Sequence, residues 1–454
     1  TANTYPPPMR IVVVGGGFGA LAAAVRLAKL GHEVTLFEAS DRLGGAIGSI
    51  THEGFTWQTG PTYTLVPAVI RDLYVKSGRK VEREFDLVPT GPQRHLFTDG
   101  TAVDLPAGSR AEQLHSLDAA LGQGAGRAWL DWVAPYADTW AALRRDWFEK
   151  PYDASLSAPM TTSLLRSRTS LWTSARSLGD PRLRALALAD TLTEGHRPSR
   201  TPAWWGVHHY LRQTFDTWTV PAELGGMARV SHSLTQRLST RRVEVRLNTP
   251  VLDVAMSGRS MTGVRTAHGD HPADAVVVGI DPKYLPALAR LTRRLPQALP
   301  PHIAHLGLEE VPAQLEAPEL VVHGDPHLVV RTQGAAVSVL AYSPHPIDPI
   351  TALATRGIDL RQRISVRIDV TPSEQSALGS PLGVAWNGRS TLKHRIGTRS
   401  PIEGVYMVGA HTTPGAGMPY VGLSAALAGA GCPSERAGAL TRLIVNRFAS
   451  GPQV

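Results

Sequence analysis

The apolar residues near the start of the chain follow two different spacings. Residues 11 to 14 form a continuous run of isoleucine and valine, which is typical of a strand buried on both faces. Apolar positions at helical spacing follow from Leu21 to Leu30, and a second strand-like run extends from Glu33 to Phe37. The pattern predicts a strand, a helix and a second strand, the unit from which parallel sheets are built.

Apolar runs elsewhere predict further strands and helices. The predicted strands are Val243 to Leu247, Val251 to Met256, Met261 to Ala267, Val276 to Ile280, Ile303 to Leu308, Leu320 to His323, His327 to Arg331, Val337 to Tyr342 and Gly404 to Ala410. Residues from about 110 to 224 have helical spacing instead, and they begin at a capping box, Ser109 to Glu112. An alanine-rich run from Val421 predicts a helix near the end of the chain.

A glycine-rich turn joins the first strand to the first helix. Glycines at this point let the backbone turn tightly and approach a pyrophosphate, which the free N–H groups of the helix start can bind. Glu38 ends the second strand, where an acidic residue accepts hydrogen bonds from ribose hydroxyls and repels a 2′-phosphate. The unit predicts a site for NAD or FAD rather than NADP. Its predicted cofactor-binding residues are Gly15, Gly17, Phe18, Gly19, Ala20, Glu38 and Ala39.

A second glycine pair follows the acidic residue and favours FAD. Asp41 to Ser49 reads DRLGGAIGS, and Gly54 to Pro61 reads GFTWQTGP. These segments resemble the R-x-G-G-R and G-F-x-x-D-x-G-P motifs of the flavin-dependent amine oxidase and phytoene desaturase superfamily. The chain departs from the motifs at Ala46, where the family usually has arginine, and at Gln58, where it usually has aspartate. The resemblance implies cofactor contacts by Arg42, Gly44, Gly45, Ala46, Gly60, Pro61 and Thr62.

Residues 404 to 421 resemble the C-terminal signature of bacterial-type phytoene desaturases. In that family the segment runs along the isoalloxazine ring, and the following helix directs its positive end at the ring. The resemblance implies cofactor contacts by Gly409, Ala410, Gly417, Met418 and Val421, and an adenine contact by Val251.

Three residues depart from this signature. His411 replaces glycine, Thr413 replaces histidine and Tyr420 replaces glycine. His411 and Tyr420 are the candidate catalytic residues, because both side chains can orient a substrate or carry a proton beside the flavin. The alternative for His411 is that it only hydrogen-bonds backbone groups of its own turn.

The order of elements predicts an α/β fold in which a Rossmann-like FAD-binding domain is discontinuous and an α+β substrate domain is inserted. The FAD-binding domain is predicted to comprise residues 1–108, 225–282 and 396–454. The substrate-binding domain is predicted to comprise 109–224 and 283–395.

The composition is that of an ordinary globular protein, with 454 residues, 43% of them hydrophobic and 19% charged. No signal peptide or membrane-spanning run is evident, which predicts a cytoplasmic protein. The net charge of +8 comes without a nucleic-acid motif, so nucleic acid is not an expected partner. No histidine or cysteine array has ligand spacing, so no metal site is expected. The single cysteine, Cys432, fits a buried inert thiol better than a covalent flavin link.

The predicted helical segment carries two notable patterns. Eight of the ten tryptophans lie between Trp129 and Trp218, and Trp129 to Trp147 form a stripe that Pro135 interrupts. This stripe fits core packing and also fits the wall of a substrate cavity. Leu164 to Arg184 interleaves five arginines with leucines, which fits a solvated helical face or peripheral contact with an anionic membrane.

These observations predict an FAD-dependent dehydrogenase or desaturase. Hydride transfer to flavin N5 would oxidise C–H bonds of an apolar, polyene-like or isoprenoid-like substrate. A second glycine fingerprint is missing, so the expected electron acceptor is oxygen, a quinone or a carrier protein rather than bound NADPH. Three alternatives stay open: a flavin oxidase of a cyclic or amine substrate, a redox-neutral isomerase or cyclase using FAD, and a non-catalytic escort protein of the same fold.

Overall fold

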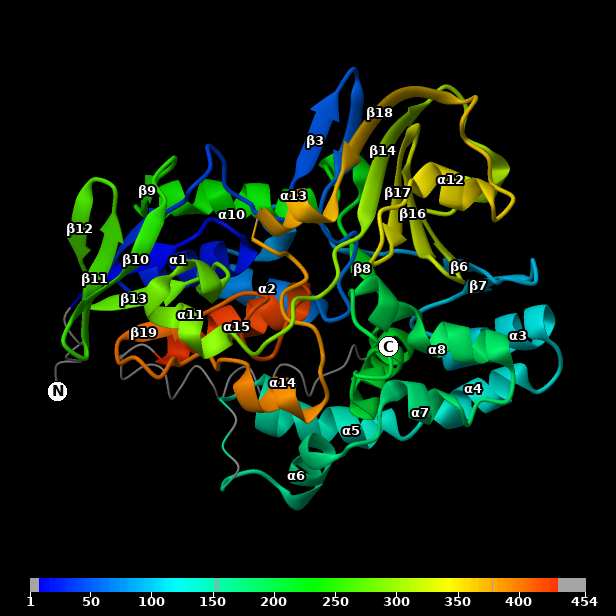
Figure 1. The fold of residues 1–454 in the computed structure, drawn as a ribbon, viewed down its shortest axis with the longest axis horizontal. Coiled ribbons are helices and arrows are strands. Elements are labelled where there is room, and N and C mark those ends of the chain that lie inside the picture. The colour runs from blue at the N-terminus through cyan, green and yellow to red at the C-terminus, as the bar shows by residue number, and fades with distance from the viewer. Residues whose placement is uncertain (1–7, 152, 154, 378, 432–454) are drawn as a thin grey trace.

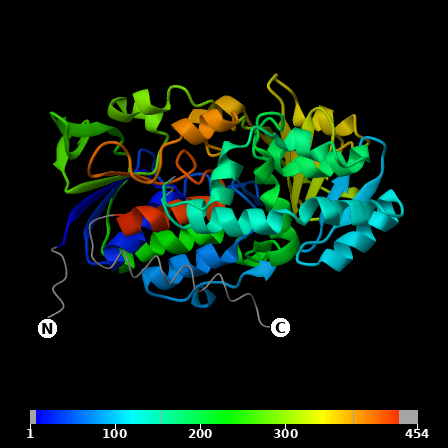
Figure 2. The same cartoon turned by 90° about the horizontal axis from the view of Figure 1, so that it is seen from below.

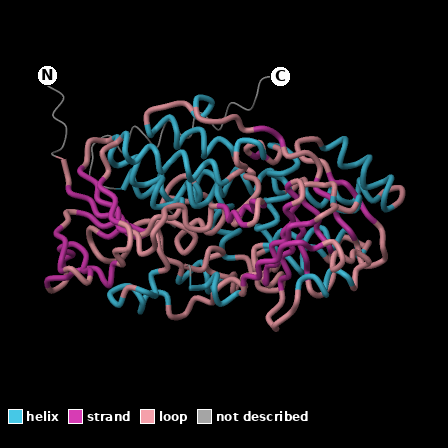
Figure 3. The backbone as a smooth tube through the Cα atoms, turned by 90° about the horizontal axis from the view of Figure 1, so that it is seen from above, coloured by secondary structure: helices cyan, strands magenta, loops and turns pink. Residues whose placement is uncertain are grey.

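A computed structural model describes residues 8–151, 153, 155–377 and 379–431. Two groups of strands lie toward opposite ends of the long axis, and helices extend between and beneath them (Figures 1 and 3). Residues 1–7 and the C-terminal stretch with Cys432 lie outside the described residues. In the described part no helix is long and apolar enough to cross a membrane.

A five-stranded parallel sheet gathers strands from distant parts of the sequence. Its order is β19 (Val405–Met407), β13 (Ala275–Val278), β1 (Arg10–Val14), β2 (Glu33–Phe37) and β9 (Glu244–Arg246). Helices α1 (Phe18–Lys29), α2 (Pro67–Ser77), α10 (Ala228–Thr240) and α15 (Met418–Gly431) pack together beside this sheet around a shared apolar core. The predicted Rossmann-like arrangement is therefore confirmed.

A small antiparallel sheet covers the opposite face. It consists of β10 (Val251–Ser257), β11 (Ser260–Thr266) and β12 (Gly269–Pro272), and its apolar residues pack against β1, β13 and β19 together with α11 (Pro286–Thr292). The short η5 helix (Pro282–Tyr284) precedes α11.

A seven-stranded sheet forms the second group of strands. Its order is β18 (Ile364–Val370), β14 (His302–Leu308), β17 (Ala336–Tyr342), β16 (His327–Gln333), β15 (Glu319–Val322), β6 (Gln93–Leu96) and β7 (Ala102–Leu105). Helix α12 (Pro349–Ala354) packs on it. Two of its strands come from residues before 108, since β6 pairs with β15 and β7 pairs with β6. Residues 93–105 thus belong with the inserted sheet by their hydrogen bonds.

Two further pairs of short antiparallel strands are present. One is β3 (Ser49–His52) with β4 (Phe55–Gln58), and the other is β5 (Val88–Pro89) with β8 (Trp218–Thr219). The remaining short elements are η1 (Val81–Arg83), η4 (Ala222–Leu224), η6 (Ala313–Leu315), α13 (Pro372–Ala377) and α14 (Arg389–His394).

The helical segment lies beside the seven-stranded sheet (Figure 2). It comprises α3 (Arg110–Leu121), α4 (Ala125–Val133), α5 (Tyr136–Leu143), η2 (Arg144–Phe148), α6 (Pro159–Arg166), α7 (Leu171–Ala175), α8 (Pro181–Thr193), η3 (Ala203–Gly206) and α9 (Val207–Phe215). The predicted cap is present, since the Ser109 side chain accepts a hydrogen bond from the Glu112 amide. Pro135 separates α4 from α5, as expected from its missing amide proton.

The structure places the aromatic stripe and the basic stretch of this segment in different surroundings. The aromatic stripe packs into the core, where Trp129, Trp140 and Trp147 are each under 10% exposed. The basic stretch from Leu164 to Arg184 does not form one helical face, because loops divide it among α6, α7 and α8. Its leucines still point inward while Arg166 and Arg176 are exposed.

Candidate flavin and substrate site

The glycine turn after β1 is shaped for an anion. Gly15 has a φ of +96°, a conformation that favours glycine, and its amide donates to the Phe37 carbonyl at 2.8 Å. A Cβ added to Gly17 would meet no described atom within 4 Å, so its α-carbon faces open space. In the described chain no side chain caps the start of α1. The first amides of α1 are therefore available to a phosphate group.

Glu38 follows β2 directly, and its side chain hydrogen-bonds to the glycine turn. One carboxylate oxygen accepts from the Gly16 amide at 2.5 Å, and the other accepts from the Ser40 amide at 2.8 Å. The Thr249 amide donates to the Glu38 carbonyl at 2.9 Å, which brings the strand that starts at Val251 beside the acid. The predicted ribose and adenine contacts thus lie at neighbouring strand ends.

The second glycine pair stacks on the first. The Gly44 amide donates to the Gly16 carbonyl at 2.8 Å. A Cβ on Gly45 would lie 2.9 Å from the Gly17 α-carbon, and one on Gly60 would lie 2.6 Å from the Ala46 carbonyl oxygen. Glycine is required at both positions because the backbones approach so closely.

The C-terminal signature meets the glycine turn from the other side. A Cβ on Gly19 would lie 3.0 Å from a Val421 methyl carbon and 3.1 Å from the Gly409 α-carbon. The Gly409 amide donates to the Ser424 hydroxyl at 3.0 Å, which ties the loop to α15. Segments around residues 17, 45, 60 and 409 are therefore brought together as the sequence motifs predict.

The remaining predicted cofactor residues divide by exposure. Ala39, Arg42, Gly45 and Ala46 are exposed, and Gly60, Pro61, Thr62, Ala410 and Val421 are partly exposed. Phe18, Ala20, Gly409 and Met418 are buried, so they shape the backbone or the floor of the site. Open glycine turns, an uncapped helix start and an acid at the second strand end fit a flavin dinucleotide.

Comparison with known proteins bears on this fit. A model of the family described as flavin containing amine oxidoreductase matches residues 21–313, well over half of the chain. The chain belongs to this family. It is therefore an FAD-dependent oxidoreductase.

Curated relatives of this family member include carotenoid enzymes. The 4,4'-diapolycopene oxygenase of a Methylomonas species is 25% identical over 92% of this chain and 97% of its own length. The zeta-carotene-forming phytoene desaturase of Myxococcus xanthus is 26% identical over 92% of both proteins. A neurosporene-forming phytoene desaturase of Rhodobacter capsulatus is 31% identical over 60% of this chain and 52% of its own.

Solved structures share the fold at low identity. A cyclohexylamine oxidase from Brevibacterium oxydans superposes with a TM-score of 0.65 at 15% identity, covering 98% of this chain and 100% of that one. An oxidoreductase from Methanosarcina mazei gives 0.61 at 16% identity, covering 92% and 99%.

The two candidate catalytic residues have different surroundings in this family member. His411 is buried, and its Nε2 lies 3.1 Å from the Gly379 carbonyl oxygen while its Nδ1 lies 3.8 Å from Asp281. The backbone acceptor belongs to a segment 32 residues away rather than to the turn of His411 itself. The Tyr420 hydroxyl instead lies 2.6 Å from His208 Nε2.

Tyr420 begins a buried polar chain that the sequence did not reveal. His208 Nδ1 lies 3.3 Å from a Glu194 oxygen, and the other Glu194 oxygen accepts from Trp205 Nε1 at 2.7 Å. Burial raises the pKa of Glu194 to about 8 and lowers that of His208 to about 4, so both are neutral near pH 7. No local motif marks Glu194, since it reaches this chain only through the packing of α8 against α9.

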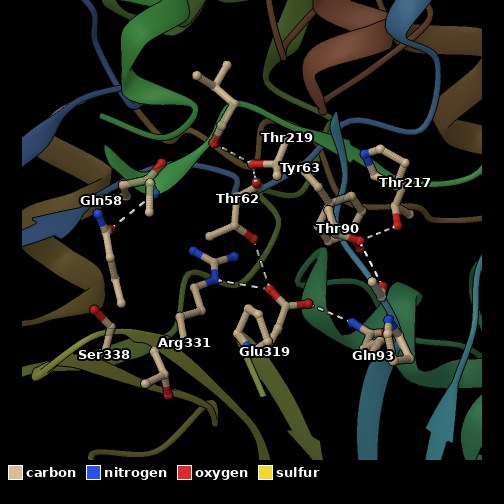
Figure 4. A pocket seen from close by; sticks show the side chains of 18 of the residues that line it. Gln58, Thr62, Tyr63, Thr90, Gln93, Thr217, Thr219, Glu319, Arg331 and Ser338 are labelled. Carbon is tan, nitrogen blue, oxygen red and sulfur yellow. Dashed lines mark hydrogen bonds and ion pairs between the residues drawn. The ribbon is translucent and has the colours of Figure 1, made fainter. Parts of the chain in front are cut away.

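A cavity of about 250 Å³ adjoins the predicted cofactor segment at Thr62. Its walls come from β4, β5, β8 and strands β15 to β17 of the large sheet. Trp57, Val220 and Ala336 supply apolar surface, and none of the tryptophans of the 129–147 stripe lines it. Figure 4 shows Thr62, Gln93 and Arg331 converging on Glu319.

Gln58, one of the departures from the family motif, lines this cavity. Its side-chain oxygen accepts from the Met227 amide at 2.7 Å and its nitrogen donates to Gln333 at 3.3 Å. A neutral amide is suited to this place because it both accepts and donates, which an ionised aspartate cannot do.

Proposed function

We propose that this enzyme is a desaturase or dehydrogenase of polyene or isoprenoid-like molecules. The observation that carries the proposal is the cavity that opens directly beside Thr62 of the flavin-binding segment. A molecule whose end occupies the cavity would lie against the cofactor site. Support also comes from relatives named for carotenoid substrates that match nine-tenths of the chain.

Bound FAD supplies a two-electron acceptor that takes a hydride at N5. The chain's own residues then have to hold the substrate and manage one proton. The chain of Tyr420, His208 and Glu194 has two neutral arrangements, because each neutral imidazole nitrogen either donates or accepts. To change one arrangement into the other, Tyr420 passes its proton to His208 and takes one from the substrate. His208 passes a proton to Glu194, and the proton that Glu194 already carried leaves to solvent from its partly exposed side chain. We assign Tyr420 the proton-handling role and give His411 the lesser role of holding its loop.

We further propose that electrons leave to oxygen, a quinone or a carrier protein, and that the enzyme touches anionic membranes where apolar substrates dissolve. Leu156, Met160 and Trp172 are 73%, 42% and 52% exposed. They accompany the exposed side chains of Arg166, Arg168 and Arg176 around α6 and α7, at the lower edge of Figure 1. Exposed apolar groups beside cations suit an anionic bilayer surface.

The proposal is tested by mixing the purified holoenzyme with phytoene under anaerobic conditions. We expect the visible absorbance of oxidised flavin to fall while the polyene gains a double bond. Cyclohexylamine serves as the parallel amine substrate. Bleaching by the amine but not by phytoene would contradict the proposal, and a product of unchanged mass would indicate isomerisation.

Substituting Tyr420→Phe in the same assay tests its assigned role. FAD content should be kept, while the rate of flavin reduction should change tenfold or more, on the order of 1.4 kcal/mol of barrier. Tyr136→Phe is the matched control, since that buried hydroxyl belongs to the same apolar cluster but binds the Ala203 carbonyl rather than His208. Equal rates in the two variants would place Tyr420 outside the chemistry.

A further inference from the structure

We propose that the cavity beside Thr62 binds a neutral, oxygen-bearing end of the polyene substrate, such as a hydroxyl or carbonyl group. This inference rests on the proposed function and names its substrate class more closely. The cavity volume of about 250 Å³ is below the roughly 300 to 1,000 Å³ of pockets that enclose drug-sized ligands. It therefore holds one end of a long polyene rather than the whole molecule.

The cavity wall carries an arginine N–H that makes no hydrogen bond to the described residues. Within the described residues, Arg331 Nε is buried without a hydrogen bond, and the nearest acceptor to it is a Glu319 oxygen at 3.4 Å. The single hydrogen bond of the Arg331 guanidinium goes to the Gly60 carbonyl at 2.9 Å. A buried polar group without a partner is costly, so a ligand that supplies an oxygen is favoured here.

The charged residues of the cavity wall favour an uncharged substrate group over an anionic one. Arg331 Nε lies 3.4 Å from Glu319, which also accepts from Thr62 at 3.1 Å and Gln93 at 2.6 Å. Arg212, the other cation of the wall, lies 3.0 Å from Asp190. Each arginine is thus compensated by its own carboxylate. A substrate carboxylate or phosphate would find no free cation, and it would face Glu319 at close range.

The titratable groups next to the cavity add no charge to its wall at neutral pH. Burial raises the pKa of the Tyr63 hydroxyl, which accepts from Arg212 at 2.8 Å. Burial also lowers the pKa of His305 to about 4, and this residue lies 2.8 Å from the Ser338 hydroxyl on the cavity wall. Both groups are neutral at neutral pH. Trp57, Val220 and Ala336 offer apolar contact to the carbon chain behind the oxygen.

The test compares three probes that share one C20 polyene skeleton: retinol, retinoic acid and the parent hydrocarbon axerophthene. Binding to the holoenzyme is followed by quenching of tryptophan fluorescence, because the polyenes absorb where tryptophan emits. We expect retinol to bind about tenfold more tightly than the hydrocarbon, the effect of one hydrogen bond to a charged group. Retinoic acid should bind more weakly than retinol.

The variant Glu319→Gln sharpens the test. The carboxamide oxygen of the glutamine can still accept from Gln93, and its NH2 group can donate to the Thr62 hydroxyl. The substitution removes the charge that compensates Arg331, so retinoic acid should become the tightest of the three probes. Glu310→Gln is the matched control, since it removes the carboxylate of an exposed arginine pair at Arg363. FAD absorbance per protein confirms that each variant is folded.

The outcomes separate the inference from the proposed function. Equal binding of the three probes, or an unchanged order in Glu319→Gln, would overturn the oxygen-end inference while phytoene turnover still stands. Binding of none of the probes would also overturn it. Loss of flavin bleaching with every polyene would instead overturn the proposed function itself.

Discussion

At the scale of single residues, the partly buried carboxyl of Glu194 contributes a pH dependence to the stability of this protein. Its pKa of about 8 lies well above the usual value near 4.5, because burial disfavours the charged form. The folded state therefore holds a proton that the unfolded chain has released between pH 4.5 and 8. The stabilising contribution is complete below pH 4.5 and is lost as the pH rises toward 8.

We expect Glu194→Gln to lose less stability than the wild type between pH 5 and 8. Glutamine keeps an oxygen that accepts from Trp205, and it has no ionisable proton. The slopes of the unfolding free energy against pH should therefore differ between the two proteins by up to about 1.4 kcal/mol per pH unit. Denaturant unfolding at several pH values measures it. His208 titrates on the acid side in both proteins and largely cancels.

Glu223→Gln provides the control, because this side chain is exposed on η4. Its stability should follow the wild type across the range. Parallel slopes for Glu194→Gln and the wild type would show that Glu194 is already ionised in the folded protein.

At the scale of elements, the close contact between glycine turns decides whether FAD is held. Gly45 has a φ of +57° and lies against Gly17, so any side chain pushes the two turns apart. We expect Gly45→Ala to retain less than a tenth of the FAD of the wild type after desalting, measured by flavin absorbance per protein.

Gly54→Ala separates backbone strain from close contact. Gly54 also has a positive φ, of +82°, but a Cβ there would meet no described atom within 4 Å. This variant should keep its flavin. Equal retention by both variants would mean that the approach of Gly45 to Gly17 is unimportant for binding.

The elements also show what the sequence could predict. The first strand, helix and strand, the glycine turns and the late helix are local patterns, and the structure has them within a few residues. The pairing of residues 93–105 with the large sheet could not be predicted, because a short polar strand such as β6 carries no local sign of the sheet that it joins. The chain from Tyr420 to Glu194 was missed for a similar reason, since contacts across 212 residues leave no local spacing.

At the scale of the whole molecule, the exposed apolar and basic surface around α6 and α7 predicts membrane binding. Replacing Arg166, Arg168 and Arg176 with glutamine should weaken cosedimentation with anionic liposomes at low salt, by about 1 kcal/mol per charge. Neutral liposomes should bind both proteins weakly. A matched triple variant at Arg259, Arg293 and Arg294, outside this helical region, controls for the loss of net charge. Equal binding by the two triple variants would contradict a dedicated surface.

The five-stranded sheet also has a consequence for how the protein is made. Its strands come from residues 10–37, 244–278 and 405–407, and Gly19 is packed against Gly409 and Val421. At about 5 to 20 residues per second, roughly 20 to 80 s separate the synthesis of the glycine turn from that of its partner. During that interval the ribosome-bound chain exposes the apolar faces that β19 and α15 will cover. FAD binding is accordingly a late event in synthesis. A chain that stops before residue 405 lacks the segment that packs against Gly19.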